Sequence, residues 1–220
     1  MMKYKIAYID EDKGWINTFY QTFKNDFEIL RIVVNSESSV ESILGQLLSS
    51  NLDAIVTDYL LEENAEVPFN GNKIVEEIKR IRPHFPIVML TSFPTQAIGH
   101  TDDVHIIYNK NILSVENDRE KEELDIFKSK IQSNITNYYR KIEDTNVKIE
   151  TLIEKRNNQG LEILEEEELS KLYILFDELN PEGKDLPANL IHRDSISKLN
   201  EFVNETKEIL EELKKLNQGK

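Results

Sequence analysis

Cysteine is absent from this chain of 220 residues. Disulfides, thiolate zinc sites and cysteine nucleophiles are therefore excluded, and the composition fits a reducing compartment. Long apolar runs are missing too, because no stretch approaches the roughly 20 apolar residues that a membrane-spanning helix needs. The first residues lead directly into an apolar alternation and show no signal-peptide core. These absences predict a soluble, cytoplasmic protein without a membrane partner.

Positive charge is scarce in both halves of the chain. The first 114 residues carry 10 basic and 16 acidic side chains, the remaining residues carry 17 and 25, and the net charge is −14. Nucleic-acid binding depends on a basic surface that neutralises phosphates, and no run of lysine and arginine suggests one here. The composition therefore argues against a nucleic-acid partner for either half.

Short apolar runs alternate with amphipathic stretches in the first half of the chain. Continuous apolar strands that alternate with helices are typical of a parallel sheet covered on both faces. We therefore expect an α/β domain with an open, doubly wound sheet of five parallel strands, a flavodoxin-like fold. The expected strands are 4–9, 29–34, 54–57, 86–90 and 104–108, and the expected helices are 15–23, 40–48 and 74–81.

From about Asn117 the pattern becomes purely helical. Asn117 and Glu120 have the spacing of a capping pair at a helix start. We expect a long helix over 118–156 with a heptad-like apolar seam typical of a coiled coil, then helices over 165–179 and about 195–217. Three amphipathic helices must pack on one another or on a partner.

The chain is thus expected to divide into two parts that share the long helix. Residues 1–130 form the α/β domain, and residues 131–220 form an all-α module for protein interaction or dimerisation.

Polar side chains follow the predicted strands at their carboxyl ends, where binding sites form in open parallel sheets. Carboxylates from two neighbouring strand ends suit a hard cation such as Mg²⁺. A lysine and a hydroxyl opposite them can bind the remaining oxygens of a phosphoryl group. Taken singly, each position is more often structural, but their joint order favours a site. In chain order they are Asp10, Glu11 and Asp12 after the first strand, Asp58 after the third, Thr91 and Ser92 after the fourth, and Lys110 after the fifth.

These motifs resemble the receiver domain of bacterial two-component response regulators. The resemblance covers about residues 3–130. It is carried by IDED at 9–12, DAIVTD at 53–58, Gly71 at a helix start, PIVMLTS at 86–92 and YNK at 108–110.

In that family, the aspartate that ends the third strand accepts a phosphoryl group from a sensor histidine kinase. The resemblance implies that Asp58 is the phosphoacceptor, Thr91 the switch hydroxyl and Lys110 the cation that binds the acyl phosphate. It also implies a signalling protein that is not an enzyme, with an output through the C-terminal helices to a protein partner or a second copy. The implied Mg²⁺ ligands are Asp10, Glu11, Asp58 and the Leu60 carbonyl.

Two spacings depart from the family pattern. Gly71 comes thirteen positions after Asp58 where eight is usual, so 61–70 is expected to be an enlarged loop beside the site. The interval from Thr91 to Lys110 is a few residues short, so the fourth helix is expected to be short or irregular.

Two substitutions leave other functions open. Ile107 stands where the family has a switch aromatic, and Asn111 stands where it has a proline. A receiver-like scaffold that does not switch by phosphorylation is therefore the first alternative. The second is an aspartate-nucleophile phosphatase, a class that places a second acid where this chain has Leu60.

Overall fold

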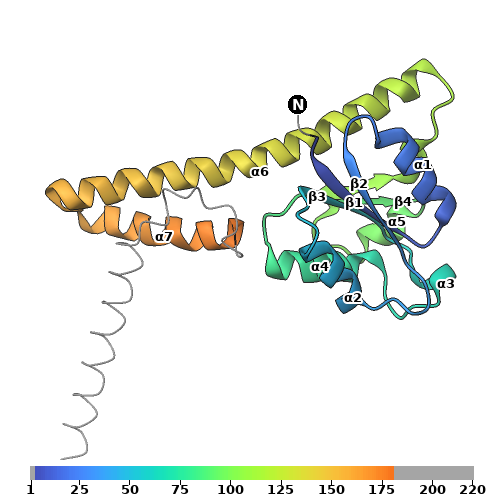
Figure 1. Cartoon of the computed structure of the whole chain (residues 1–220), viewed down its shortest axis with the longest axis horizontal. Helices are drawn as coiled ribbons and strands as arrows, with labels where there is room; N and C mark the ends of the chain where they lie inside the picture. Colours follow the sequence, from blue (N-terminus) through green and yellow to red (C-terminus); the bar gives the residue numbers. More distant parts are fainter. Residues whose placement is uncertain (1–2, 181–220) are drawn as a thin grey trace, which may run out of the picture. The chain divides into compact units, whose positions relative to one another are not determined.

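The structure is a computed structural model, and it describes residues 3–180. Its centre is a five-stranded, all-parallel sheet with the order β2-β1-β3-β4-β5 (Figure 1). This order is the flavodoxin-like doubly wound topology, so the expected fold class is confirmed. The strands are β1 (Lys5–Asp10), β2 (Glu28–Val33), β3 (Ala54–Asp58), β4 (Ile87–Thr91) and β5 (Ile107–Asn109).

Helices cover both faces of the sheet. They are α1 (Lys13–Phe23), α2 (Val40–Leu48), α3 (Glu62–Ala65), α4 (Gly71–Ile81), α5 (Pro94–Ile98), α6 (Asp118–Gln159) and α7 (Ile163–Leu179). The side chains of β1 alternate between two buried clusters, with Ala7 and Ile9 in one and Ile6 and Tyr8 in the other. Helices α2 and α4 contribute to the first cluster, and α1 and α6 to the second. Within 3–180, no helix has both the length and the hydropathy to cross a bilayer.

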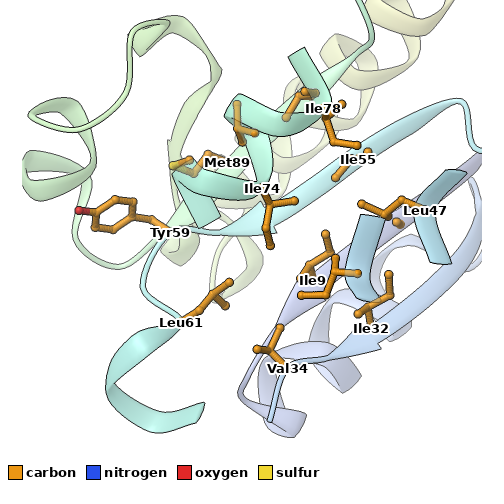
Figure 2. Packing of buried hydrophobic residues seen from close by; sticks show 14 of the residues in the cluster. Ile9, Ile32, Val34, Leu47, Ile55, Tyr59, Leu61, Ile74, Ile78 and Met89 are labelled. Carbon is orange, nitrogen blue, oxygen red and sulfur yellow. The ribbon is translucent and has the colours of Figure 1, made fainter. Parts of the chain in front are cut away.

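The first cluster shows how the sheet holds its covering helices. Leu47 of α2 and Ile74 and Ile78 of α4 lie over Ile55 and Met89 of the sheet (Figure 2). Burying each such side chain contributes about 1.5–3 kcal/mol to stability. The same packing holds the carboxyl ends of the strands in place, and the candidate site lies at these ends.

The fifth strand differs from its prediction. Val104–Ile106 forms a 3-10 turn, and β5 is only Ile107–Asn109. The Asp103 side chain accepts a hydrogen bond of 3.2 Å from the His105 amide, which closes the turn. The apolar run alone predicted a strand over 104–108. The capping hydrogen bond favours a 3-10 turn instead over the first three of these residues.

Helix α6 is continuous over 42 residues, as predicted, and ends at Gln159, three residues beyond the expected end. At 1.5 Å per residue it is about 63 Å long. The Asn117 side chain caps its first turn by accepting a 3.0 Å hydrogen bond from the Glu120 amide. Ile131 packs in the second cluster under the sheet, whereas Ile149 is buried in the part of α6 that α7 accompanies (Figure 1).

The middle of α6 lies against the amino-terminal side of the sheet. The hydroxyls of Tyr4 and Thr136 are 3.3 Å apart. Tyr139 donates a hydrogen bond of 2.5 Å to Asp53, the residue just before β3. Tyr138 donates to the Leu179 carbonyl at the end of α7. These contacts tie α6 to the α/β domain and the end of α7 to α6.

The remaining helical predictions have different outcomes. The helix expected over 165–179 is α7, which begins two residues earlier. The helix expected over about 195–217 lies outside the described residues. The division into parts at residue 130 stays a prediction.

Candidate functional site

The parallel register brings the predicted acidic residues together. Ile9 pairs with Thr57, and Asp58 pairs with Leu90 of β4. Asp10 and Asp58 therefore end neighbouring strands at the carboxyl edge of the sheet. Both are buried, and Asp58 is only 4% exposed.

Lys110 bridges the two aspartates. It follows β5 directly and is 2% exposed. Its Nζ lies 2.8 Å from Asp10 Oδ2 and 2.9 Å from Asp58 Oδ2. Charge-assisted contacts of this length are strong. Because Lys110 contacts both carboxylates, it can stay paired with whichever of the two is ionised.

A third carboxylate completes a group that could hold a metal. Asp10, Glu11 and Asp58 each offer an oxygen, and these atoms lie within 4.8 Å of one another. Oxygen ligands at this spacing suit Mg²⁺, which takes a few carboxylates and keeps waters and phosphate oxygens as further ligands. The donor set also has more negative charge than Lys110 can offset. The residues present therefore fit the ion that the resemblance implies.

Burial sets the ionisation of the site. Desolvation raises the pKa of Asp58 to about 7, Lys110 acts against this shift, and the Asp10 charge adds to it. Burial by itself would lower the pKa of Lys110, but Asp58 and Asp10 together raise it above its ordinary value. Lys110 is therefore charged at neutral pH, whereas Asp58 is close to its midpoint.

Tyr8 is a site residue that the sequence argument missed. Its hydroxyl donates a hydrogen bond of 2.5 Å to Asp10 Oδ2, and the Asp12 amide donates one of 2.9 Å to Asp10 Oδ1. Side chains two residues apart in a strand point to the same face. The Tyr8–Asp10 spacing was therefore a signal that could have predicted this contact.

Trp15 was missed as well. The sequence predicts that Trp15 lies in a helix but does not indicate that its ring approaches the site. The Lys110 Nζ lies 5.3 Å from the centre of the Trp15 ring, within the range of a cation–π contact. Trp15 thereby approaches the site from α1, a helix that begins just after the acidic residues because Asp12 caps it.

The segment after Asp58 is ordered, and it is more than the open loop that was predicted. It includes the short helix α3, and Asn70 Oδ1 accepts hydrogen bonds from the amides of Leu61 and Glu62 at 2.9 and 3.1 Å. Four apolar side chains attach it to the first cluster; these are Leu61, Ala65, Val67 and Phe69. The enlarged segment is therefore part of the core beside the site.

Gly71 is required by a close approach. A Cβ at this position would lie 1.8 Å from the Asp58 carbonyl oxygen, a backbone atom that cannot move away. The Gly71 amide also donates a 2.7 Å hydrogen bond to the Tyr59 carbonyl. The start of α4 thus presses on the backbone of the predicted phosphoacceptor, and only glycine fits there.

The other predicted positions have the following places. Thr91 ends β4, is buried, and accepts a 3.0 Å hydrogen bond from the Phe93 amide. Leu60 lies two residues after β3, and its side chain belongs to the first cluster. Ile107 begins β5, and Asn111 follows Lys110 in a 3-10 turn. Helix α5 has five residues, which confirms the short fourth helix expected from the spacing.

No protein-family model and no curated protein matches this sequence. Among solved structures, it is similar to the signal receiver domain of an HD domain-containing protein from Pseudomonas fluorescens Pf-5. The two are 14% identical, with 64% of this chain and 95% of that chain covered and a TM-score of 0.48.

Two further solved structures are similar over the same part of the chain. One is a CheY-like response regulator receiver domain protein from Methanospirillum hungatei JF-1, with 14% identity, coverage of 62% and 99%, and a TM-score of 0.44. The other is a response regulator receiver domain protein from Clostridium thermocellum, with 21% identity, coverage of 61% and 95%, and a TM-score of 0.43. These likenesses concern the fold alone.

The arrangement has a definite chemical capacity. It offers a buried carboxylate near its ionisation midpoint, a fixed cation within 2.9 Å of it, and carboxylate oxygens that suit a divalent ion. The transfer of a phosphoryl group requires a nucleophilic oxygen and positive charge that offsets the charge on the transferred group; Asp58 offers the oxygen, and Lys110 offers part of that charge.

Proposed function

We propose that Asp58 accepts a phosphoryl group from a histidine kinase, with Mg²⁺ as cofactor, in the manner of a response regulator. One observation carries this proposal: Lys110 Nζ bridges Asp10 and Asp58 at 2.8 and 2.9 Å beside the carboxylate of Glu11. Phosphoryl transfer depends on positioning and on neutralised charge; these side chains supply the positioning, and Lys110 together with a cation held by the carboxylates would supply the positive charge.

The transfer step follows from the chemistry of the residues. A carboxylate oxygen of Asp58 forms a bond to phosphorus while the P–N bond of phosphohistidine breaks. The electron pair of that bond passes to the imidazole nitrogen, which takes a proton from water. Lys110 and the Thr91 hydroxyl bind oxygens of the new acyl phosphate. Asp10, Glu11, Asp58 and the Leu60 carbonyl would hold Mg²⁺, which would supply further positive charge to the transferred group.

The direct test is the mass of the intact protein after incubation with Mg²⁺ and acetyl phosphate. The wild type is expected to gain one phosphoryl group, and EDTA is expected to prevent the gain. Asp58→Asn removes the nucleophile and is expected to abolish it. Asp102→Asn, which changes an exposed acid of the same domain, is the matched control and is expected to label normally. Undiminished labelling of the Asp58→Asn variant would overturn the proposal.

A second candidate is the scaffold that does not switch, and the burial of the site favours it. The Asp58 and Lys110 side chains are 6% and 3% exposed, which leaves little room for a phosphodonor to approach. This candidate predicts no mass gain with any phosphodonor while the protein stays folded. The same experiment therefore separates the two functions.

We infer that the output passes through α6 and α7 to a protein partner or a second copy, and that DNA is not the target. Residues 131–180 carry six basic and eleven acidic side chains, an unfavourable balance for a phosphate backbone. The mass of the protein in solution, measured with and without acetyl phosphate, tests whether a second copy is the partner. Salt-sensitive binding to random duplex DNA would contradict this inference.

A further inference from the structure

Asp10 is held by more donors than its role as a metal ligand needs. Its Oδ2 receives the Tyr8 hydroxyl at 2.5 Å and Lys110 Nζ at 2.8 Å, and its Oδ1 receives the Asp12 amide at 2.9 Å. A carboxylate has about four lone-pair positions. An ion that binds Asp10 can take the remaining position, or a position that one of these donors yields.

Tyr8 cannot yield, because its ring is clamped. It is fully buried and stacks on Phe19 with ring centres 4.0 Å apart and planes at 8°. Phe19 stacks in turn on Phe23 at 4.3 Å. Moving the hydroxyl would require this aromatic column to move within a close-packed core.

Lys110 can yield, because it has a second partner. Its Nζ already lies 2.9 Å from Asp58 Oδ2, and its side chain has four rotatable bonds. A cation bound by Asp10 and Asp58 repels the ammonium group, so the contact between Lys110 and Asp10 weakens when the ion enters. The backbone amide of Asp12 is fixed at the start of α1.

We propose that Tyr8 is the positioning residue of the metal site, holding the Asp10 carboxylate in its ligand orientation when the contact between Lys110 and Asp10 weakens. This inference rests on the proposed function and adds to it. In the absence of the hydroxyl, Asp10 Oδ2 depends on Lys110 alone, so the carboxylate loses its fixed support when the ion enters. Hydrogen bonds that orient a metal ligand typically change metal affinity by about 10–100-fold.

The test compares Mg²⁺ affinity in the wild type and in Tyr8→Phe, which retains the stacked ring. Affinity is read from the fluorescence of Trp15, the only tryptophan of the chain, which lies 5.3 Å from Lys110 Nζ. The Mg²⁺ dependence of the melting temperature gives a second value without any phosphorylation. We expect the dissociation constant of Tyr8→Phe to rise about tenfold.

Tyr108→Phe is the matched control, because Tyr108 packs on Phe127 beside the same cluster. Its Mg²⁺ affinity is expected to equal that of the wild type. Equal or tighter binding by Tyr8→Phe would overturn the role of Tyr8 and leave the proposed function intact. A wild type that responds to Mg²⁺ in neither measurement would overturn the metal site itself, and the role of Tyr8 with it.

Discussion

Three carboxylates and one lysine share the carboxyl end of the sheet, so at the scale of single residues their charges are unbalanced. Asp58 is the residue on which this imbalance acts, since burial and Asp10 raise its pKa to about 7 against the opposing effect of Lys110. A carboxyl whose pKa is higher in the folded state than in the unfolded state binds a proton more tightly when folded. The contribution of Asp58 to the free energy of unfolding therefore falls as the pH rises from about 4 to about 7 and then levels off.

Asp58→Asn is therefore expected to stabilise the protein at pH 8 in the absence of Mg²⁺. The gain is at most about 4 kcal/mol, because one unit of pKa shift corresponds to about 1.4 kcal/mol. At pH 5 most of the difference from the wild type is expected to disappear. Urea unfolding at both pH values measures it, with Asp102→Asn as the control. A variant less stable than the wild type at pH 8 would show that Asp58 is not a destabilising charge.

Gly71→Ala is expected to destabilise the protein by about 1–3 kcal/mol, the usual range for an inserted atom that meets fixed neighbours. The added Cβ would collide with the Asp58 carbonyl oxygen. Gly45→Ala is the matched control, because a Cβ there meets no atom within 4 Å and the residue is inside α2. The free energy of unfolding of Gly45→Ala is expected to rise by about 0.5–1 kcal/mol, because alanine has a higher helix propensity than glycine. Thermal unfolding of both variants measures the contrast, and equal effects would contradict it.

At the scale of elements, the enlarged segment between β3 and α4 differs most from the family pattern. The count of residues from Asp58 to Gly71 predicted its size, but its order arises from apolar anchors and from the Asn70 side chain. That side chain accepts two backbone hydrogen bonds nine and eight residues earlier in the chain. Because the segment is anchored in this way, it stays in one place beside Asp58, and the access to Asp58 that it leaves does not vary.

Asn70→Ala is expected to loosen the start of this segment. Two amides, those of Leu61 and Glu62, lose their acceptor, and each lost hydrogen bond costs about 0.5–1.5 kcal/mol. Hydrogen exchange should therefore become faster by about one order of magnitude at these two amides, with little change in the central strands. Asn72→Ala is the control, since its side chain donates to the His100 carbonyl instead. Unchanged exchange at Leu61 and Glu62 would show that the apolar anchors alone order the segment.

The sequence predicted elements better where apolar periodicity decides the structure than where a single polar side chain does. The strands through Ile9 and Thr57 and the long helix after Asn117 follow from alternation and capping. The loss of three strand residues to a 3-10 turn depends on one hydrogen bond from His105 to Asp103. The predicted site residues could be found because they lie at strand ends. The contact of Tyr8 with Asp10 could not be found in this way, because it depends on how the Tyr8 ring packs.

At the scale of the whole molecule, α6 belongs to two packing systems. Its first part is buried under the sheet, and its last part is accompanied by α7, with Arg156 and Glu166 3.2 Å apart between the two helices. The end of α7 returns to the domain, where His84 and Glu178 lie 3.2 Å apart and Tyr138 bonds Leu179. Contacts between residues so distant in sequence could not be predicted from periodicity.

Ile149→Asp is expected to detach α7 without unfolding the α/β domain. Ile149 is 5% exposed, and a buried charge without a partner is strongly unfavourable. Val147→Asp is the matched control, because Val147 lies two residues away on the same helix and is 52% exposed. Hydrogen exchange over 163–179 should rise in Ile149→Asp alone, while labelling of Asp58 persists in both. Equal protection of α7 in both variants would contradict this account of the helices.

The contact between Tyr4 and Thr136 joins residues that are 132 positions apart. During translation, β1 leaves the ribosome early, and the helix that covers one of its faces leaves long afterwards. Until Ile131 and Ile135 have emerged, the face of the sheet that carries Ile6 and Tyr8 has α1 as a cover but lacks α6, so part of it stays exposed to water and to other nascent chains. The speed of synthesis between β5 and the middle of α6 therefore sets how long each new molecule carries this incompletely covered face.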